Sequence, residues 1–323
     1  MRELATVIVG CGLIGRQYSR SLRSIGARVV AVCDPDPARR ESVAALIGAR
    51  AFATLAEAIA ATRPDVVCIC TPAPAHHRAV LEAAAVPAHV FLEKPMAETP
   101  DQARRMVDAM AASGRAFGFG LKMRFESVFA EAHRLVEAGT IGVPLEVVLT
   151  YNQNVPPPDR LWYLDEGVLL GSMPHPFDLA NWWLGRTPER LRAETWRRLG
   201  HAGEDRVHAV AAYEGGARAV VQMAYHRDFP EVAARDDIVF QIVGERGYLL
   251  GQRPDSLVSV TSAGRRTHPT PPVEPFAAEL RAFLDAASAG LPPPVSGETG
   301  LLIQEMTAAA ASSAATGEWV ELA

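Results

Sequence analysis

Residues 6–15 read Thr-Val-Ile-Val-Gly-Cys-Gly-Leu-Ile-Gly. A short apolar, β-rich run leads into a turn with three spaced glycines, and a helix-like segment (16–25) follows. In such a turn Gly10 allows a tight bend, Gly12 lets the backbone approach a pyrophosphate, and Gly15 lets the helix pack on the strand. The phosphates then lie on free N–H groups at the helix N-terminus. We therefore predict that the dinucleotide is held by Gly10, Cys11, Gly12, Leu13, Ile14 and Gly15.

A carboxylate follows at the spacing that a dinucleotide site requires. The second expected strand, 29–33, ends directly before Asp34, about 20 residues beyond the last glycine. A carboxylate there holds both ribose hydroxyls of NAD and repels the 2′-phosphate of NADP. Arg39 and Arg40 follow closely and offset part of that repulsion. We predict NAD as cofactor, with Asp34 and Arg39 among its contacts and NADP as the alternative.

Composition excludes several classes of protein. The chain has 323 residues, which favours about two domains. Its net charge is −5, and its 32 Lys and Arg residues form no basic block, so we expect no nucleic-acid partner. No apolar run approaches the ~20 residues of a membrane helix, so we expect no membrane partner. The first strand begins almost at once, without a signal-peptide pattern, which predicts a cytoplasmic protein.

The four cysteines, Cys11, Cys33, Cys68 and Cys70, all lie on expected strands or at their ends. Cys68 and Cys70 share one face of one strand, which is poor geometry for a disulfide or a zinc pair. We expect buried, reduced thiols.

The pattern of elements changes once along the chain. Up to about residue 120, apolar strands alternate with helical stretches, which predicts a doubly wound parallel sheet of the Rossmann type over residues 1–121. The expected strands there are 6–9, 29–33, 66–70, 89–92 and 116–120. Residues 122–323 carry long β-like runs with fewer helices. They predict an α+β domain with an open, mostly antiparallel sheet that binds substrate and assembles the protein.

The run Phe91-Leu92-Glu93-Lys94-Pro95 follows the fourth expected strand. A lysine at the carboxyl end of a parallel strand lies where α/β sheets hold their ligands. The peptide bond before Pro95 is a candidate for the cis form, which would direct Lys94 toward the ligand. We predict cofactor contacts from Thr71, Pro72, His76, Glu93 and Lys94, the last as the catalytic residue. A surface lysine in an ordinary loop is the alternative.

A second cluster contains His175 and Asp178. Their spacing of three residues at a helix start places them on one face. His175 can exchange a proton near neutral pH, and Asp178 can orient the imidazole or cap the helix. A structural histidine is the alternative. No third clustered ligand accompanies them, so we expect no metal.

In these motifs the chain resembles the glucose–fructose oxidoreductase / inositol dehydrogenase (Gfo/Idh/MocA) family. The resemblance covers nearly the whole length, and Glu93-Lys94-Pro95 after the glycine fingerprint is its most specific part. It implies a Rossmann domain joined to an open sheet, and oxidation or reduction of a sugar, cyclitol or related metabolite with NAD or NADP. It also implies that Lys94 is the catalytic lysine and that His175 transfers a proton or orients the substrate.

Two positions depart from the family's pattern. Gly171 stands where these enzymes usually carry an aspartate, four residues before the histidine, and Lys122 stands in place of an asparagine. Losing a carboxylate and gaining a cation favours a substrate with an acidic group. Two alternatives stay open: Lys122 can pair with an acid of the protein, and an acid of the preceding loop, Asp165 or Glu166, can fill the gap. The predicted substrate-binding residues are Lys122, Arg124, Asn152, Trp162, His175 and Asp178.

Two other functions stay open: a non-redox, NAD-dependent glycosidase-like enzyme, and a catalytically inactive scaffold of the same fold. The identity of the substrate, the direction of the reaction and the choice between C–O and C–N chemistry are open too. The second domain has too few helices to cover both faces of its sheet. We therefore predict a homodimer or homotetramer formed through that sheet, with Val147, Leu149, Val210, Val220 and Ile238 on the contact face.

Overall fold

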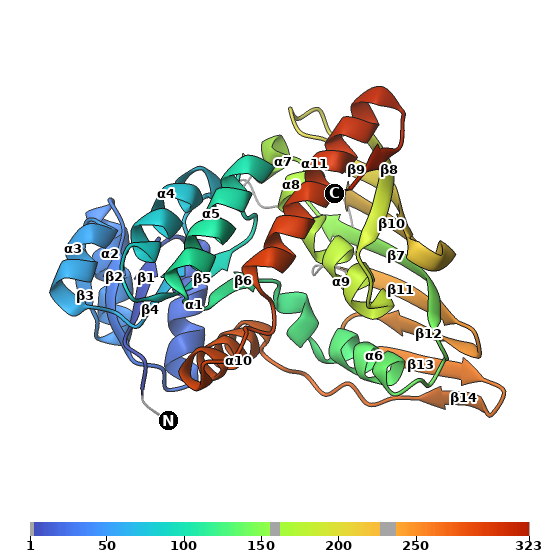
Figure 1. Ribbon diagram of the computed structural model, residues 1–323, viewed down its shortest axis with the longest axis horizontal. Helices are drawn as coiled ribbons and strands as arrows, with labels where there is room; N and C mark the ends of the chain where they lie inside the picture. Colours follow the sequence, from blue (N-terminus) through green and yellow to red (C-terminus); the bar gives the residue numbers. More distant parts are fainter. Residues whose placement is uncertain (1–2, 156–161, 227–236, 323) are drawn as a thin grey trace. The chain divides into compact units, whose positions relative to one another are not determined.

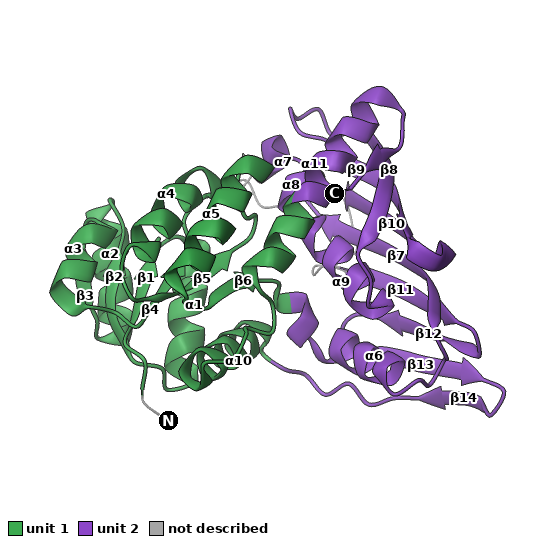
Figure 2. Cartoon of the chain, in the orientation of Figure 1, with its two compact units in different colours: residues 1–122, 274–304 green, residues 123–273, 305–323 purple. Residues whose placement is uncertain are grey.

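The computed structural model describes residues 3–155, 162–226 and 237–322, except for the side chain of Trp162. The chain divides into two units (Figure 2). Unit 1 holds residues 1–122 and 274–304, and unit 2 holds residues 123–273 and 305–323. Residues 274–304, which the sequence assigned to the second domain, thus pack with the first.

Unit 1 is built on a six-stranded sheet with the order β3-β2-β1-β4-β5-β6 (Figure 1). Every pair of neighbouring strands is parallel, as the Rossmann prediction requires. The strands are β1 (Thr6–Val9), β2 (Val29–Cys33), β3 (Arg50–Phe52), β4 (Val66–Ile69), β5 (His89–Glu93) and β6 (Phe117–Gly120). The helices are α1 (Leu13–Ser24), α2 (Pro37–Ile47), α3 (Leu55–Thr62), α4 (Ala73–Ala84), α5 (Pro100–Ser113) and α10 (Pro275–Ala289).

Local sequence explains where these helices begin and end. The Asp36 side chain accepts hydrogen bonds from the first backbone N–H groups of α2, and Gly48 ends that helix in the left-handed conformation. Thr99 caps α5 in the same way, and Pro100 follows at its first position.

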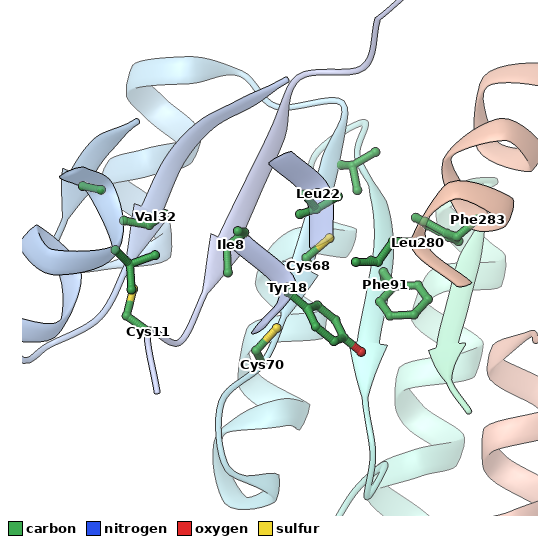
Figure 3. Packing of buried hydrophobic residues seen from close by; sticks show 13 residues of the cluster. Ile8, Cys11, Tyr18, Leu22, Val32, Cys68, Cys70, Phe91, Leu280 and Phe283 are labelled. Atoms are coloured by element: carbon green, nitrogen blue, oxygen red, sulfur yellow. The ribbon is translucent and has the colours of Figure 1, made fainter. Parts of the chain in front are cut away.

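Helix α10 completes the core of unit 1 (Figure 3). Phe283 packs against Phe91 of β5 with ring centroids 5.0 Å apart, and Leu280 is fully buried in the same cluster. The neighbouring β6 carries Gly118, where a Cβ would lie 2.5 Å from the Phe283 ring. The returning chain therefore belongs to this core.

Unit 2 contains a nine-stranded sheet with the order β14-β13-β12-β11-β7-β10-β9-β8-β15. Neighbouring strands are antiparallel except for β7 and β10, which run parallel. The strands are β7 (Pro144–Asn154), β8 (Pro188–Trp196), β9 (Arg206–Tyr213), β10 (Arg218–His226), β11 (Asp237–Gly244), β12 (Gly247–Gln252), β13 (Ser256–Thr261), β14 (Gly264–Thr267) and β15 (Val320–Glu321). The predicted fold class is thus confirmed for both units.

The helical segments of unit 2 are α6 (Ser127–Glu137), α7 (Trp162–Glu166), α8 (Val168–Gly171), α9 (Pro174–Leu184) and the later part of α11 (Gly297–Thr316). Two short 3-10 turns, η1 (Lys122–Phe125) and η3 (Glu214–Gly216), complete the list of described helices. No helix in the described part of the chain is long and apolar enough to cross a membrane.

The two faces of the large sheet differ. Trp183 of α9 stacks on Phe240 of β11, with ring centroids 4.6 Å apart, and helix α6 packs on the same face through Phe129. Burial alternates along β10, as expected for a strand with one covered face. Val147, Leu149 and Ile238 are fully buried on the covered face, so their predicted place on an exposed patch is wrong. The two remaining predicted positions, Val210 and Val220, are half-buried and point to the other face.

Candidate functional site

The glycine turn has the geometry of a dinucleotide site. Gly10 has a φ of +93°, and a Cβ there would lie 2.8 Å from the Cys70 carbonyl. A Cβ at Gly15 would lie 1.8 Å from the carbonyl oxygen of Gly10, so both positions require glycine. Gly12, by contrast, has open space where its Cβ would be, and no side chain caps the start of α1. The first N–H groups of α1 and the space beside Gly12 therefore fit a pyrophosphate.

Asp34 ties this turn to the end of β2. Its buried carboxylate accepts a hydrogen bond from the Cys11 N–H (2.8 Å) through one oxygen and from the Asp36 N–H (2.9 Å) through the other. Each carboxylate oxygen has a second lone pair, which suits the hydroxyls of a ribose. Arg40 donates to the backbone carbonyl of Asp34 (3.2 Å), whereas Arg39 forms an exposed ion pair with Asp36 (3.3 Å). The arginine nearer to Asp34 is thus Arg40.

His76 connects two of the predicted cofactor-binding segments. The ring is fully buried, with Nε2 2.6 Å from the Thr71 carbonyl oxygen and Nδ1 2.9 Å from that of Pro95. Burial lowers its pKa. Thr71 lies two residues beyond the end of β4, and Pro72 precedes the first residue of α4. The imidazole therefore links the segment after β4 to the turn that follows Lys94.

Lys94 comes directly after β5, and its peptide bond to Pro95 is cis, as predicted. Glu93 is buried, and its Oε2 accepts a hydrogen bond of 2.8 Å from the hydroxyl of Tyr18 in α1. The same hydroxyl lies 3.4 Å from Oε1 of Glu279 in α10. Tyr18 and Glu279 did not emerge as site residues from the sequence. Glu279 lies in the stretch Phe276-Ala-Ala-Glu-Leu, which belongs to the pattern shared with the family.

Lys122 belongs to unit 1 and opens the η1 turn. Its Nζ lies 5.4 Å from the centroid of the Phe276 ring in α10.

Asp178 and Arg124 form a buried ion pair in unit 2. The guanidinium binds both carboxylate oxygens, at 2.8 Å and 2.5 Å, and also lies over the Trp182 ring at 5.2 Å. Burial raises the pKa of Asp178, and the positive charge of Arg124 acts against that rise. The charge of Arg124 is therefore already balanced within the protein. His175 is buried one helical turn earlier on α9.

Gly171 lies at the end of α8, under the ring of Tyr163. The Tyr163 hydroxyl donates a hydrogen bond to the Gly171 carbonyl oxygen, and a Cβ at 171 would lie 2.9 Å from the ring's Cζ. Asp165, one of the acids expected to fill the gap, accepts a hydrogen bond from the Ala202 N–H (3.1 Å) instead.

Two predicted substrate residues remain. Asn152 pairs through Oδ1 with Nε2 of His226 (2.9 Å). Trp162 opens α7, and its side chain lies outside the described residues.

All four cysteines are buried and free. Burial raises the pKa of the Cys11, Cys33 and Cys68 thiols to about 12, so they stay protonated at neutral pH. Protonated thiols are poor nucleophiles and poor metal ligands, which agrees with a packing role.

Family models match both units. Residues 4–121 match the oxidoreductase family with an NAD-binding Rossmann fold (GFO_IDH_MocA), and residues 129–250 match the GFO/IDH/MocA C-terminal domain. The first model describes an NAD-binding Rossmann fold, so the predicted dinucleotide-binding unit is confirmed.

Curated relatives agree with this assignment. The chain is 29% identical over 297 residues to inositol 2-dehydrogenase 3 of Saccharopolyspora erythraea, covering 88% of this chain and 85% of that protein. It is 34% identical over 208 residues to the inositol 2-dehydrogenase of Acidothermus cellulolyticus, covering 63% of this chain and 60% of that protein.

The fold also matches solved structures. An oxidoreductase from Agrobacterium radiobacter, crystallised with NAD+, L-tartaric acid and magnesium, aligns over 99% of this chain and 98% of its own, with a TM-score of 0.91 and 24% identity. The chain therefore belongs to the Gfo/Idh/MocA family and is an oxidoreductase with an NAD-binding Rossmann domain.

Proposed function

We propose that this protein is an NAD-dependent dehydrogenase that acts on a hydroxyl-bearing carbon of a small polyol, cyclitol or hydroxy acid. One observation carries the proposal. Strands β1 and β5 lie in the same parallel sheet, and the glycine turn and Lys94 follow directly after them. The carboxyl ends of parallel strands meet at one edge, so the nucleotide-binding turn and a candidate acid–base group share that edge.

Lys94 is the residue that we assign to proton transfer. As a neutral amine, its Nζ accepts the proton that the substrate hydroxyl loses, and it returns that proton in the reverse direction. The nicotinamide, when bound, supplies the hydride acceptor. Glu93 and the cis Lys94–Pro95 peptide define the backbone from which this amine projects.

His175 is the proton-transfer or orienting group that we assign to unit 2. It is buried at the start of α9, and the Arg124–Asp178 pair fixes the next turn of that helix. Because Asp178 is engaged with Arg124, we assign His175 a supporting role and Lys94 the main one.

The proposed substrate class rests on two arguments. The curated relatives are named inositol 2-dehydrogenases, which supports a cyclitol or another polyol. The absence of a carboxylate at Gly171 favours a substrate that does not require one, such as a hydroxy acid. Of the two cations expected to attract an acid, Arg124 has a carboxylate partner in Asp178.

A substrate screen tests the proposal. The purified protein is mixed with NAD+ or NADP+ and with myo-inositol, glucose, glycerol or L-tartrate, and the absorbance of the reduced nicotinamide is followed. The reverse reaction is assayed with the keto forms and NADH. Turnover of at least one compound supports a dehydrogenase. NAD that stays bound without net turnover, together with cleavage of a glycoside, would replace this proposal with the glycosidase reading.

We also propose that the protein is a cytoplasmic homodimer or homotetramer. The half-buried valines Val148, Val210 and Val220 lie side by side on β7, β9 and β10, on the face opposite α6 and α9. An apolar row of this kind on a sheet face is typical of an interface. Four reduced cysteines agree with a reducing compartment.

A further inference from the structure

Two carboxylic acids are buried around a single tyrosine hydroxyl in unit 1. Tyr18 is fully buried, Glu279 is 2% exposed and Glu93 is 7% exposed. The Tyr18 Oη lies 2.8 Å from Oε2 of Glu93 and 3.4 Å from Oε1 of Glu279. The three side chains come from α1, β5 and α10. Figure 3 shows Tyr18 in the core cluster, beside Cys70 and Phe91.

Gly120 of β6 leaves the room that this group needs. A Cβ at this position would lie 2.5 Å from Oε2 of Glu93 and 3.0 Å from the Tyr18 hydroxyl. The contact between Tyr18 and Glu93 therefore depends on a glycine in the neighbouring strand.

The number of hydrogens decides which acid is charged. A tyrosine hydroxyl has one hydrogen, and its shorter contact assigns that hydrogen to Glu93. For the longer contact, of 3.4 Å, to be a hydrogen bond as well, the hydrogen must come from Glu279 itself. The other oxygen of Glu279, Oε2, has no hydrogen-bond partner among the described residues, which is costly for a buried carboxylate and far less so for a neutral acid.

We propose that Glu279 is a neutral carboxylic acid that donates to Tyr18, that Tyr18 donates to an ionised Glu93, and that this ordered chain positions the Lys94 turn. The positioning part rests on the proposed function of Lys94, whereas the protonation of Glu279 does not. No bond other than hydrogen bonds forms or breaks in this arrangement.

The charges around the group agree with this order. Burial raises the pKa of Glu279 well above its usual range, and the neighbouring Glu93 and Glu274 raise it further, against the charge of Lys122 and the Tyr18 hydroxyl. Burial also raises the pKa of Glu93, but four groups oppose this rise: the charges of Lys94 and Lys122, the Tyr18 hydroxyl and the Lys94 backbone N–H. Glu93 thus has the partners that a carboxylate needs.

Infrared spectroscopy tests the protonation of Glu279 without any assay of activity. At neutral pH the wild-type protein should show the C=O stretch of a protonated carboxylic acid, with a shift in heavy water. The band should vanish in Glu279→Gln, and in Tyr18→Phe it should move because its hydrogen-bond partner is lost. A wild-type-minus-Glu279→Gln spectrum without such a band would overturn the assignment.

Kinetics test the positioning of Lys94. Tyr18→Phe and Glu279→Leu should lower kcat roughly 10-fold, less than the ~10²-fold cost of misplacing a reacting group by 1 Å. The Kd for NAD should stay within a few-fold. Glu279→Gln should recover most of kcat relative to Glu279→Leu, because its amide N–H still donates to Tyr18. Tyr18→Phe keeps the aromatic ring in the core, so it tests the positioning role even if Glu279→Leu fails to fold.

The outcomes separate this inference from the proposed function. If Glu279→Gln is as slow as Glu279→Leu, or if Tyr18→Phe leaves kcat unchanged, Tyr18 and Glu279 do not position Lys94. The proposed role of Lys94 in proton transfer would not be affected by that result. If the wild-type protein oxidises no compound, the proposed function fails, and the infrared band still decides the protonation of Glu279.

Discussion

The hydroxyl of Tyr163 donates a hydrogen bond to the carbonyl oxygen of Gly171, and its ring occupies the space where a side chain at position 171 would begin. The resemblance to the family implies an aspartate at position 171. The Tyr163 ring lies where the side chain of that residue would begin. Restoring the acid therefore requires two changes rather than one.

Gly171→Asp should destabilise the protein by roughly 1–3 kcal/mol, because a Cβ would lie 2.9 Å from Tyr163 Cζ and force the ring to move. As a single substitution, Tyr163→Ala should also destabilise the protein. In the double variant it should recover part of the stability that Gly171→Asp loses. Urea unfolding of the four proteins in this cycle measures the coupling. Strictly additive losses would show that the two residues do not compete for this space.

Lys94→Ala should lower kcat by about 10²–10⁴, the usual contribution of a positioned acid–base group, with the Kd for NAD changed far less. His175→Ala serves as the comparison. It should cost less, because Lys94 still carries the proton. If kcat of Lys94→Ala stays within a few-fold of the wild-type value, Lys94 is not the residue that transfers the proton.

Wild-type protein should bind NAD more tightly than NADP, because the carboxylate of Asp34 repels a 2′-phosphate. Asp34→Ser should reduce this preference by about 10-fold or more, which corresponds to ~1.4 kcal/mol. The variant should also unfold more easily, since the N–H groups of Cys11 and Asp36 lose their acceptor. Titration of both cofactors into both proteins measures the change. Equal or tighter binding of NADP by the wild type would contradict the assignment.

The raised pKa of Glu279 makes stability depend on pH in a defined direction. Above the unfolded value of about 4.3, the folded protein binds more protons at this site than the unfolded chain does. The free energy of unfolding should therefore fall as the pH rises from there through the folded pKa. Glu279→Gln should lose this dependence and gain stability relative to the wild type as the pH rises.

The control for this prediction is Glu298→Gln, at an exposed position in the first turn of α11. Glu298→Gln should leave the dependence of the free energy of unfolding on pH unchanged. Denaturant unfolding at several pH values compares the three proteins. Parallel curves for the wild type and Glu279→Gln would contradict a buried, protonated Glu279.

Local signals explain what could be predicted from the sequence. The strands at 6–9 and 29–33 were predicted with their observed bounds, because each is a short apolar run that ends directly before Gly10 or Asp34. Strand β3, only three residues long at the edge of the sheet, has no apolar run and was missed. Lys94 stood out through its motif, and its predicted role still awaits a test.

Contacts between distant residues explain what could not be predicted. Tyr18 and Glu279 are 261 positions apart, and Arg124 and Asp178 are 54 apart. No local pattern encodes such pairs. The sequence therefore suggested that Arg124 offers its charge to a ligand, whereas its guanidinium is paired with Asp178.

The assembly prediction can be tested within one strand. Val148 of β7 lies on the face of the sheet opposite α6 and α9, next to Val220. Leu145 lies near the start of the same strand, outside the row of Val148, Val210 and Val220 and where the pairing with β11 shifts register, and is 42% exposed. Val148→Glu should turn the dimer or tetramer into smaller species, because a charge in an apolar interface loses its water. Leu145→Glu should leave the assembly intact, and both variants should stay folded by circular dichroism.

Light scattering at micromolar concentration compares the assembly of the two variants with that of the wild type. A monomeric wild type, or a Val148→Glu variant that assembles as the wild type does, would show that this face does not form the interface.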